Sequence, residues 1–125
     1  MKQARYFVDA EFRKCTPSCS IEDMDEEFLF ILDNIRKKAG IPLVLNSAFR
    51  SPAYEKKMGR TGTSAHTYGK AVDIRCSTSS NRMKIVSAAI ACGITRIGIG
   101  KNFVHIDSAG KAENLPEGVM FHYYE

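Results

Sequence analysis

Residues 96–107 read RIGIGKNFVHID, and this stretch decides the fold. Two runs rich in strand-forming residues, Arg96 to Ile99 and Phe103 to Asp107, flank the turn sequence Gly100-Lys101-Asn102. A pattern of this kind is typical of a β-hairpin. The sequence therefore predicts two antiparallel strands that are direct neighbours in a sheet.

Three further segments have the character of strands. Ala71 to Arg75 is predicted to be a strand, Leu43 to Leu45 a short buried strand, and Val119 to Tyr124 an edge strand. Because side chains alternate along a strand, His105 and Asp107 share one face, and Asp73 points away from its apolar neighbours. Two strands can thus present ionisable groups to one pocket.

The clearest predicted helix begins after Ser20, where Ser20 and Asp23 have the spacing of a capping box. Gly40 and Pro42 are expected to end it. Its apolar residues recur at steps of three and four and form one buried stripe: Ile21, Met24, Phe28, Ile31, Leu32 and Ile35.

Two other helices are predicted between the strands. Ser51-Pro52 opens a short helix that Gly59 closes, and a capped helix spans about Ser80 to Cys92. The residues from Gly59 to Ser64 should form an exposed loop. Helices inserted in a small, mostly antiparallel sheet indicate an α+β fold. No linker or repeat is visible, so residues 1–125 are expected to form a single domain.

Composition narrows the possible partners and locations. The net charge of +4 favours contact with anionic material, but the basic residues are scattered, so no nucleic-acid partner is expected. No apolar stretch approaches the roughly 20 residues that span a bilayer, and no signal-peptide pattern is present. We expect a monomer without membrane segments that accumulates in the cytoplasm as synthesised. The four cysteines are too few for a disulfide scaffold and are expected to be free thiols.

His66, Asp73 and His105 are candidate metal ligands. A catalytic zinc site typically needs three nitrogen and oxygen ligands and an open position for water. Zinc lowers the pKa of a bound water to about 7 and polarises a carbonyl, which suits peptide hydrolysis. Taken singly, each residue has an ordinary alternative, such as a solvated loop histidine. Cys15 and Cys19, at four-residue spacing, could form half of a metal site, but no second pair at suitable spacing follows, so structural thiols are favoured.

Three linked motifs carry a family resemblance. The segment SAHTYGKAVDI at 64–74 is preceded by SAFRSP at 47–52 and followed by GIGKNFVHID at 98–107. Together they resemble the zinc D-alanyl-D-alanine carboxypeptidase family, which includes phage L-alanoyl-D-glutamate endopeptidases, over about Tyr6 to Asp107. The resemblance implies a Hedgehog/DD-peptidase-like fold, a zinc cofactor and the peptidoglycan stem peptide as substrate.

The resemblance also implies roles for single residues. His66, Asp73 and His105 fall on the zinc-ligand positions, Arg50 on the arginine that receives a substrate carboxylate, and Ser64 on a position that lines the site. A guanidinium can hold a carboxylate through two parallel hydrogen bonds, which suits Arg50 to that task.

One position departs from the family pattern. Better-known members place an acid three residues before the last histidine ligand as general base, and Asn102 stands there. An amide cannot accept a proton at useful pH. We expect Asp107 to take the catalytic role, with a role in holding His105 as its alternative. Glu113 and His122 are weaker candidates for the base, because their positions relative to the metal cannot be read, and Glu55 on the short helix after Arg50 is weaker still.

Two functional hypotheses follow. The first is an active zinc peptidase that cuts D-Ala-D-Ala or L-Ala-D-Glu bonds of cell-wall peptides, with release to the wall as a phage lysis enzyme as one route. The second is a degenerate domain that binds zinc or wall peptide without cleaving, for example a phage structural component. Asn102 sustains the second hypothesis, whereas the intact ligand set and Arg50 favour the first.

Overall fold

The computed structural model describes residues 2–123, which form a five-stranded sheet with the order β1-β2-β4-β3-β5. All neighbouring strands are antiparallel except β3 and β5, which pair in parallel. The strands are β1 (Leu45–Ser47), β2 (Ala71–Arg75), β3 (Arg96–Ile99), β4 (Phe103–Asp107) and β5 (Val119–His122). The predicted α+β architecture with a mostly antiparallel sheet is confirmed.

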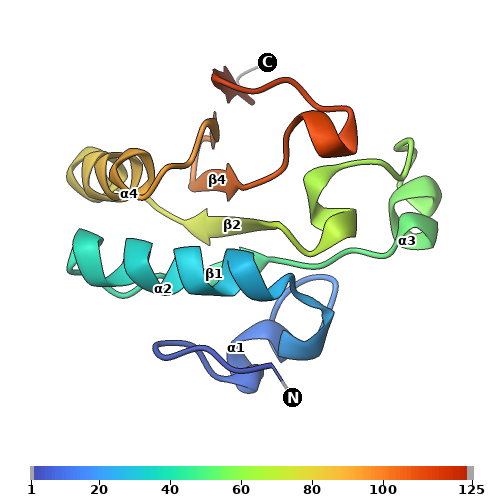
Figure 1. Ribbon diagram of the computed structural model, residues 1–125, viewed down its shortest axis with the longest axis horizontal. Helices are drawn as coiled ribbons and strands as arrows, with labels where there is room; N and C mark the ends of the chain where they lie inside the picture. The colour runs from blue at the N-terminus through green and yellow to red at the C-terminus, as the bar shows by residue number, and fades with distance from the viewer. Residues whose placement is uncertain (1, 124–125) are drawn as a thin grey trace.

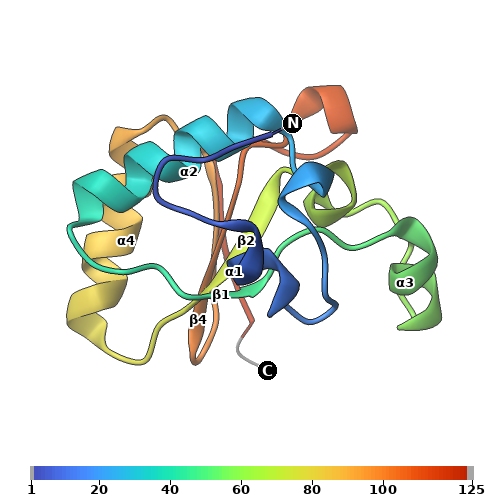
Figure 2. The ribbon, with the colours of Figure 1, turned by 90° about the horizontal axis from the view of Figure 1, so that it is seen from below.

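The helices lie around this sheet (Figures 1 and 2). Two of them, α2 and α4, pack against each other and against the sheet, and α3 lies at the opposite end of the molecule in Figure 1. The α-helices are α1 (Asp9–Arg13), α2 (Glu26–Ala39), α3 (Pro52–Lys57) and α4 (Ser79–Ala91). Three short 3-10 helices complete the set: η1 (Ile21–Asp23), η2 (Ala65–Tyr68) and η3 (Lys111–Glu113).

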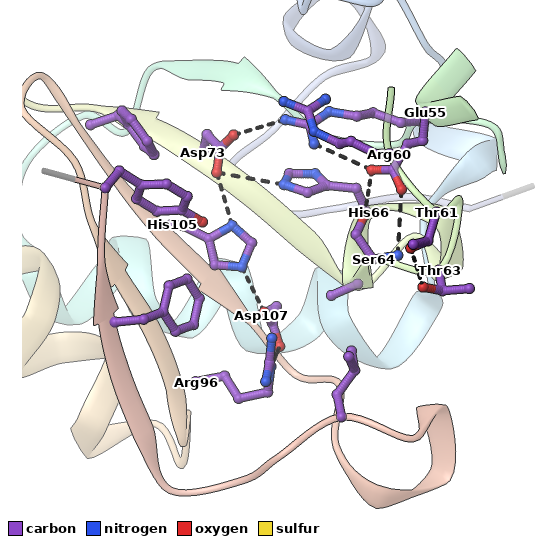
Figure 3. A pocket seen from close by; sticks show the side chains of 16 residues that line it. Glu55, Arg60, Thr61, Thr63, Ser64, His66, Asp73, Arg96, His105 and Asp107 are labelled. Carbon is purple, nitrogen blue, oxygen red and sulfur yellow. Dashed lines mark hydrogen bonds and ion pairs between the residues drawn. The ribbon is translucent and has the colours of Figure 1, made fainter. Parts of the chain in front are cut away.

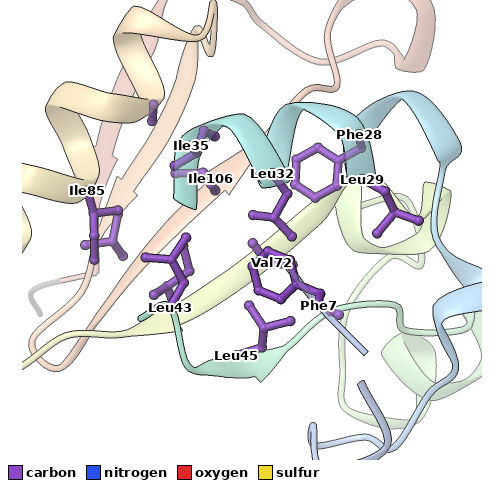
Figure 4. Close-up of a cluster of buried hydrophobic side chains, with 14 of the residues drawn as sticks. Phe7, Phe28, Leu29, Leu32, Ile35, Leu43, Leu45, Val72, Ile85 and Ile106 are labelled. Atoms are coloured by element: carbon purple, nitrogen blue, oxygen red, sulfur yellow. The ribbon is translucent and has the colours of Figure 1, made fainter. Parts of the chain in front are cut away.

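One face of the sheet forms the core. Val72 of β2 and Ile106 of β4 are fully buried, and they face the apolar stripe of α2 that includes Leu32 (Figure 4). Alternation along the strands then directs the intervening side chains, Asp73 and His105, to the other face. The sheet therefore separates an apolar core from a polar site.

The start of the long helix differs from its prediction. The capping box of Ser20 and Asp23 is present, but it caps only η1. The backbone of Met24 is extended, and Asp25 donates its N–H to the carbonyl of Gly69 at 2.9 Å, so these residues connect η1 to η2. The α2 helix begins at Glu26, where the Asp25 carboxylate accepts from the N–H of Phe28. Gly40 ends the helix with a φ of 69°, as predicted.

Two strands are also displaced from their predicted ranges. The apolar run at 43–45 marks a buried segment, but pairing with β2 begins only at Leu45, so β1 spans Leu45–Ser47. The edge strand β5 ends at His122, and Tyr124 of its predicted range lies outside the described residues. The remaining predicted strands agree with the structure, as do the two later helices to within a residue or two.

Candidate active site

Three predicted ligands converge on one point of the polar face of the sheet. Asp73 and His105 are direct partners in the β2–β4 register, and His66 comes from η2, immediately before β2. One donor atom from each lies within 4.8 Å of the other two (Figure 3). Among residues 2–123 this is the single group of three or more such side chains with metal-binding spacing.

The hydrogen bonds of the two imidazoles fit a metal centre. His66 Nδ1 lies 2.6 Å from the carbonyl oxygen of Ala48, so its Nε2 faces Asp73, with Oδ1 at 3.5 Å. His105 Nε2 lies 2.6 Å from Asp107 Oδ2, and its Nδ1 lies 2.9 Å from the same Asp73 Oδ1. Each ring thus uses one nitrogen on an outside acceptor and turns the other toward Asp73, as metal-bound histidines do. The donor set of two nitrogens and one carboxylate oxygen matches zinc.

The electrostatics of the centre favour a cation between these groups. Burial by itself would raise the pKa of Asp73, but hydrogen bonds from His105 and His66 hold it well below its usual range. Burial would likewise lower the pKa of His105, whereas its bonds to Asp107 and Asp73 raise it above the ordinary value. A metal ion bound here would therefore compete with a proton for His105 Nδ1.

Asp107 lies behind His105, on the side of the ring opposite Asp73. The carboxylate is fully buried, and its Oδ1 accepts from Arg96 Nε at 2.8 Å and from the N–H of Ala109 at 3.1 Å. Arg96, which the sequence analysis did not single out, is buried and also donates to the carbonyl of Pro116 at 2.7 Å. Both carboxylate oxygens of Asp107 are therefore engaged in hydrogen bonds.

Arg50 contacts the centre from the end of β1. Its NH2 group lies 3.2 Å from Asp73 Oδ2, its Nε donates to Ser47 Oγ at 3.1 Å, and its NH1 lies 3.4 Å from Glu55 Oε2. The backbone N–H of Arg50 donates to the carbonyl of His66 at 3.2 Å, which fixes the segment beside η2. Arg50 therefore leaves Asp73 Oδ1 free to face the two histidines.

Glu55 is a second fully buried carboxylate, on α3. It accepts hydrogen bonds from the hydroxyl of Ser64 and, at 3.4 Å, from the backbone N–H of the same residue. With its ion pair to Arg50, it links α3, the following loop and the metal centre. From the sequence, Glu55 is the weakest of the base candidates, and its position on a short helix does not indicate its burial.

The other residues considered as a base lie elsewhere. Asn102 is exposed at the tip between β3 and β4, where its carbonyl accepts from the N–H of Cys76 at 2.9 Å. Glu113 binds Lys70 at 2.8 Å, and this hydrogen bond lowers the pKa of Glu113. Neither these two nor His122 is among the described residues that line the cavity at the centre.

The three ligands lie in a cavity of about 610 Å³, a volume suited to a short peptide. One wall carries charged and hydroxyl groups from α3 and the loop after it, including Arg60, Thr61 and Thr63. The opposite wall is aromatic and comes from β4 and from β5 with the residue after it. The sequence analysis did not predict this wall: Phe103, Phe121 and Tyr123.

The aromatic wall packs directly against the centre. The ring centroids of His105 and Phe121 are 5.5 Å apart, and those of Phe103 and Tyr123 are 5.0 Å apart. A Cβ atom at Gly98 would lie 2.5 Å from the Phe121 ring, so glycine is needed for this approach. Burial, together with the charge of nearby Asp73, raises the pKa of Tyr123 to about 12.

A buried His-Asp-His group at the base of a peptide-sized cavity defines a site suited to metal-assisted hydrolysis. Residues 5–107 match the model of the Peptidase M15 family, and the chain belongs to this family. The crystal structure of Serratia marcescens L-Ala D-Glu endopeptidase ChiX is similar in fold, with a TM-score of 0.55 and 16% identity. That similarity covers 89% of this chain and 93% of the other. No curated protein matches the chain.

The family match confirms the resemblance found in the motifs and makes the chain a peptidase by class. Two further findings concern the cysteines and the helices. Cys15, Cys19, Cys76 and Cys92 are all free thiols, as predicted. Across residues 2–123, none of the helices is both long enough and apolar enough to cross a bilayer.

Proposed function

We propose that residues 1–125 form one zinc peptidase domain that hydrolyses peptide bonds in bacterial cell-wall peptides. The observation that carries the proposal is the convergence of His66 Nε2, Asp73 Oδ1 and His105 Nδ1 at the base of the cavity. Membership of the Peptidase M15 family supports peptide hydrolysis. The fold shared with an L-Ala D-Glu endopeptidase supports a stem peptide as substrate and makes endopeptidase action the first to test.

His66, Asp73 and His105 would hold the zinc ion, which, when bound, lowers the pKa of water to about 7 and polarises the scissile carbonyl. Asp107 and the carbonyl of Ala48 keep the two rings turned toward the centre. Arg50 holds Asp73 through Oδ2, so that Oδ1 remains directed at the two histidines and would be available to a bound ion. We assign Asp107 and Arg50 positioning roles, since Asp107 holds His105 and Arg50 holds Asp73.

The proton of the attacking water needs an acceptor. Asp107 is separated from the centre by His105. Glu55 is the other carboxylate outside the ligand set that lines the described cavity, and the hydroxyl of Ser64 donates to it. We propose that Ser64 passes the proton to Glu55. A buried carboxylate with a polar relay is a recognised form of general base.

A second function is favoured by one specific observation. Every carboxylate that lines the cavity already has a basic partner, and the usual base position, Asn102, is exposed at a turn. A domain that binds zinc or wall peptide without cleaving it would have these features. Incubation of the zinc-loaded chain with purified peptidoglycan, followed by mass analysis of the fragments, distinguishes the two functions. Release of cleaved stem peptides supports the enzyme, and intact peptidoglycan with zinc retained supports the binding domain.

The chain is proposed to act as a monomer. Its substrate would lie outside the cell membrane, so an enzyme that accumulates in the cytoplasm would require a separate route of release, such as host lysis by a phage. Gel filtration of the zinc-loaded chain tests the first proposal. The proposed need for a release route is tested by adding the chain to intact cells and to cells with a permeabilised membrane. If the enzyme acts from inside the cell, only the permeabilised cells should release peptidoglycan fragments.

A further inference from the structure

The basic side chains that line the cavity differ in whether they have an acidic partner. Arg50 is shared by two carboxylates, Asp73 and Glu55, and Arg96 is paired with Asp107. Arg60 also lines the cavity, but its guanidinium has no hydrogen-bond or ion-pair partner among residues 2–123. In Figure 3 it lies on the wall of Glu55, across the cavity from Arg96. Arg60 therefore carries a positive charge that the described protein does not compensate.

The loop that carries Arg60 is held at both ends by one residue. The backbone N–H of Arg60 donates to the carbonyl of Glu55 at 2.8 Å. Four residues later, Ser64 donates both its N–H and its hydroxyl to the Glu55 carboxylate. Between these ends, the hydroxyls of Thr61 and Thr63 are hydrogen-bonded at 2.7 Å. The backbone at Arg60 is thus fixed beside the cavity, while the side chain is exposed.

We propose that Arg60 binds a free carboxylate of the substrate peptide and so selects peptides that carry one close to the scissile amide. This inference rests on the proposed function. A guanidinium can bind a carboxylate through two parallel hydrogen bonds, and such charge-assisted bonds are among the stronger ones. The role differs from that expected for Arg50, whose charge is already shared by Asp73 and Glu55.

Two sources of carboxylate share this chemistry: the C-terminus of a peptide and the free carboxyl group of a D-glutamate within it. Paired synthetic stem peptides distinguish them. In one pair the C-terminus is an acid or an amide, and in the other the D-glutamate carboxyl is free or amidated. Each peptide is assayed with the zinc-loaded wild type and with Arg60→Ala, Arg60→Lys and Arg75→Ala. Arg75 is exposed on β2 and does not line the cavity, which makes it the matched control.

We expect Arg60→Ala to raise the KM for the preferred acid peptide roughly tenfold, with little change in kcat and none for its amide partner. Arg60→Lys should recover part of the loss, and Arg75→Ala should behave as the wild type. Equal effects of Arg60→Ala on acid and amide peptides would overturn the inference while leaving the proposed function intact. Unchanged KM and kcat values in Arg60→Ala would also overturn the inference.

A binding experiment tests Arg60 even if the proposed peptidase activity is absent. If the wild type cleaves no peptide, calorimetric binding of the same peptides to the zinc-loaded chain still tests Arg60. Binding of an acid peptide that weakens roughly tenfold in Arg60→Ala would support the inference for a non-cleaving domain. Absence of binding, or equal binding of acid and amide, would overturn it.

Discussion

His105 is held between two carboxylates, with Asp107 Oδ2 at 2.6 Å from Nε2 and Asp73 Oδ1 at 2.9 Å from Nδ1. The ring therefore separates the two acids: Asp73 belongs to the candidate metal site with His66 and His105, and Asp107 lies behind His105. Arg96 in turn holds Asp107 at 2.8 Å. This chain of contacts makes the tautomer and the orientation of His105 depend on β3 as well as on β4.

Asp107→Asn separates the positioning role from the catalytic one. We expect zinc affinity to fall by about 10–100-fold, because the outer partner of a ligand histidine sets its orientation and basicity. Turnover should persist once zinc is saturating. Zinc affinity is measured by competition with a chelator, and circular dichroism checks that the variant is folded. Full zinc affinity together with loss of hydrolysis would instead make Asp107 the base.

Removal of a ligand imidazole should remove the metal. The purified chain is expected to hold about one zinc ion, and His66→Ala or His105→Ala should lower the content to near zero. His122→Ala is the matched control, since His122 is outside the group with metal-binding spacing. Atomic absorption on dialysed protein gives the zinc content. Retention of full metal by both ligand variants would end the assignment.

Zinc binding should weaken as the pH falls through the folded-state pKa of His105. That pKa is raised above its ordinary value of 6.5, whereas the pKa of Asp73 is lowered from 3.8. Protonation of the histidine therefore precedes protonation of the aspartate by a wide margin. Zinc affinity measured at successive pH values should decline already in the neutral range. A decline confined to pH values below about 4 would contradict this order.

The stability of the metal-free chain should have the opposite dependence. A raised pKa for His105 in the folded state means that its contribution is fully present below the unfolded value of 6.5. The contribution is lost as the pH rises through the folded-state pKa. The lowered pKa of Asp73 contributes stability above about 3.8, which is lost as the pH falls. Urea unfolding with chelator present should show these trends, and His105→Gln should remove the first.

Glu55→Gln tests the proposed proton acceptor. A glutamine fits the same space but cannot take a proton, so kcat should fall by roughly 10²–10⁴-fold while zinc remains bound. Ser64→Ala should give a loss in the same direction if the hydroxyl relays the proton. Glu113→Gln removes a carboxylate outside the cavity and serves as the control. Normal turnover in Glu55→Gln would exclude this role.

Gly98→Ala tests the close approach of β3 to the aromatic wall. The added Cβ would lie 2.5 Å from the Phe121 ring, so we expect a loss of ~1–3 kcal/mol of unfolding free energy. In a Phe121→Ala background the same substitution should cost less, since the collision with that ring is gone. Urea unfolding of the four combinations gives the coupling. Additive effects would show that the two residues do not interact.

Local patterns predicted the parts of the site that depend on strand geometry. Alternation placed Asp73 and His105 on polar faces, and the antiparallel register of β2 and β4 makes them direct partners. The position of His66 could not be derived this way, because a loop histidine has no period, and it came from the family motif. A hairpin register also offered Arg96 as the opposite-charge partner of Asp107, a signal that went unused.

Other features depend on packing that no local pattern encodes. The real start of α2 at Glu26 reflects the hydrogen bond between Asp25 and Gly69, which are far apart in the sequence. The parallel pairing of β5 with β3 brings Phe121 to the cavity. Whether Arg60 lies over the cavity depends on how Glu55 holds its loop. These features follow from tertiary contacts between segments that are distant in the sequence.

Because β5 pairs in parallel with β3, two regions of the chain contribute to the cavity. Residues 5–107, which match the family model, include all three ligands, Arg50, Glu55 and Arg60. Phe121 and Tyr123, which form most of the aromatic wall, come after that region. A different tail on the same body would therefore change one wall of the cavity while leaving His66, Asp73 and His105 in place, so that the wall and the candidate metal site can evolve independently.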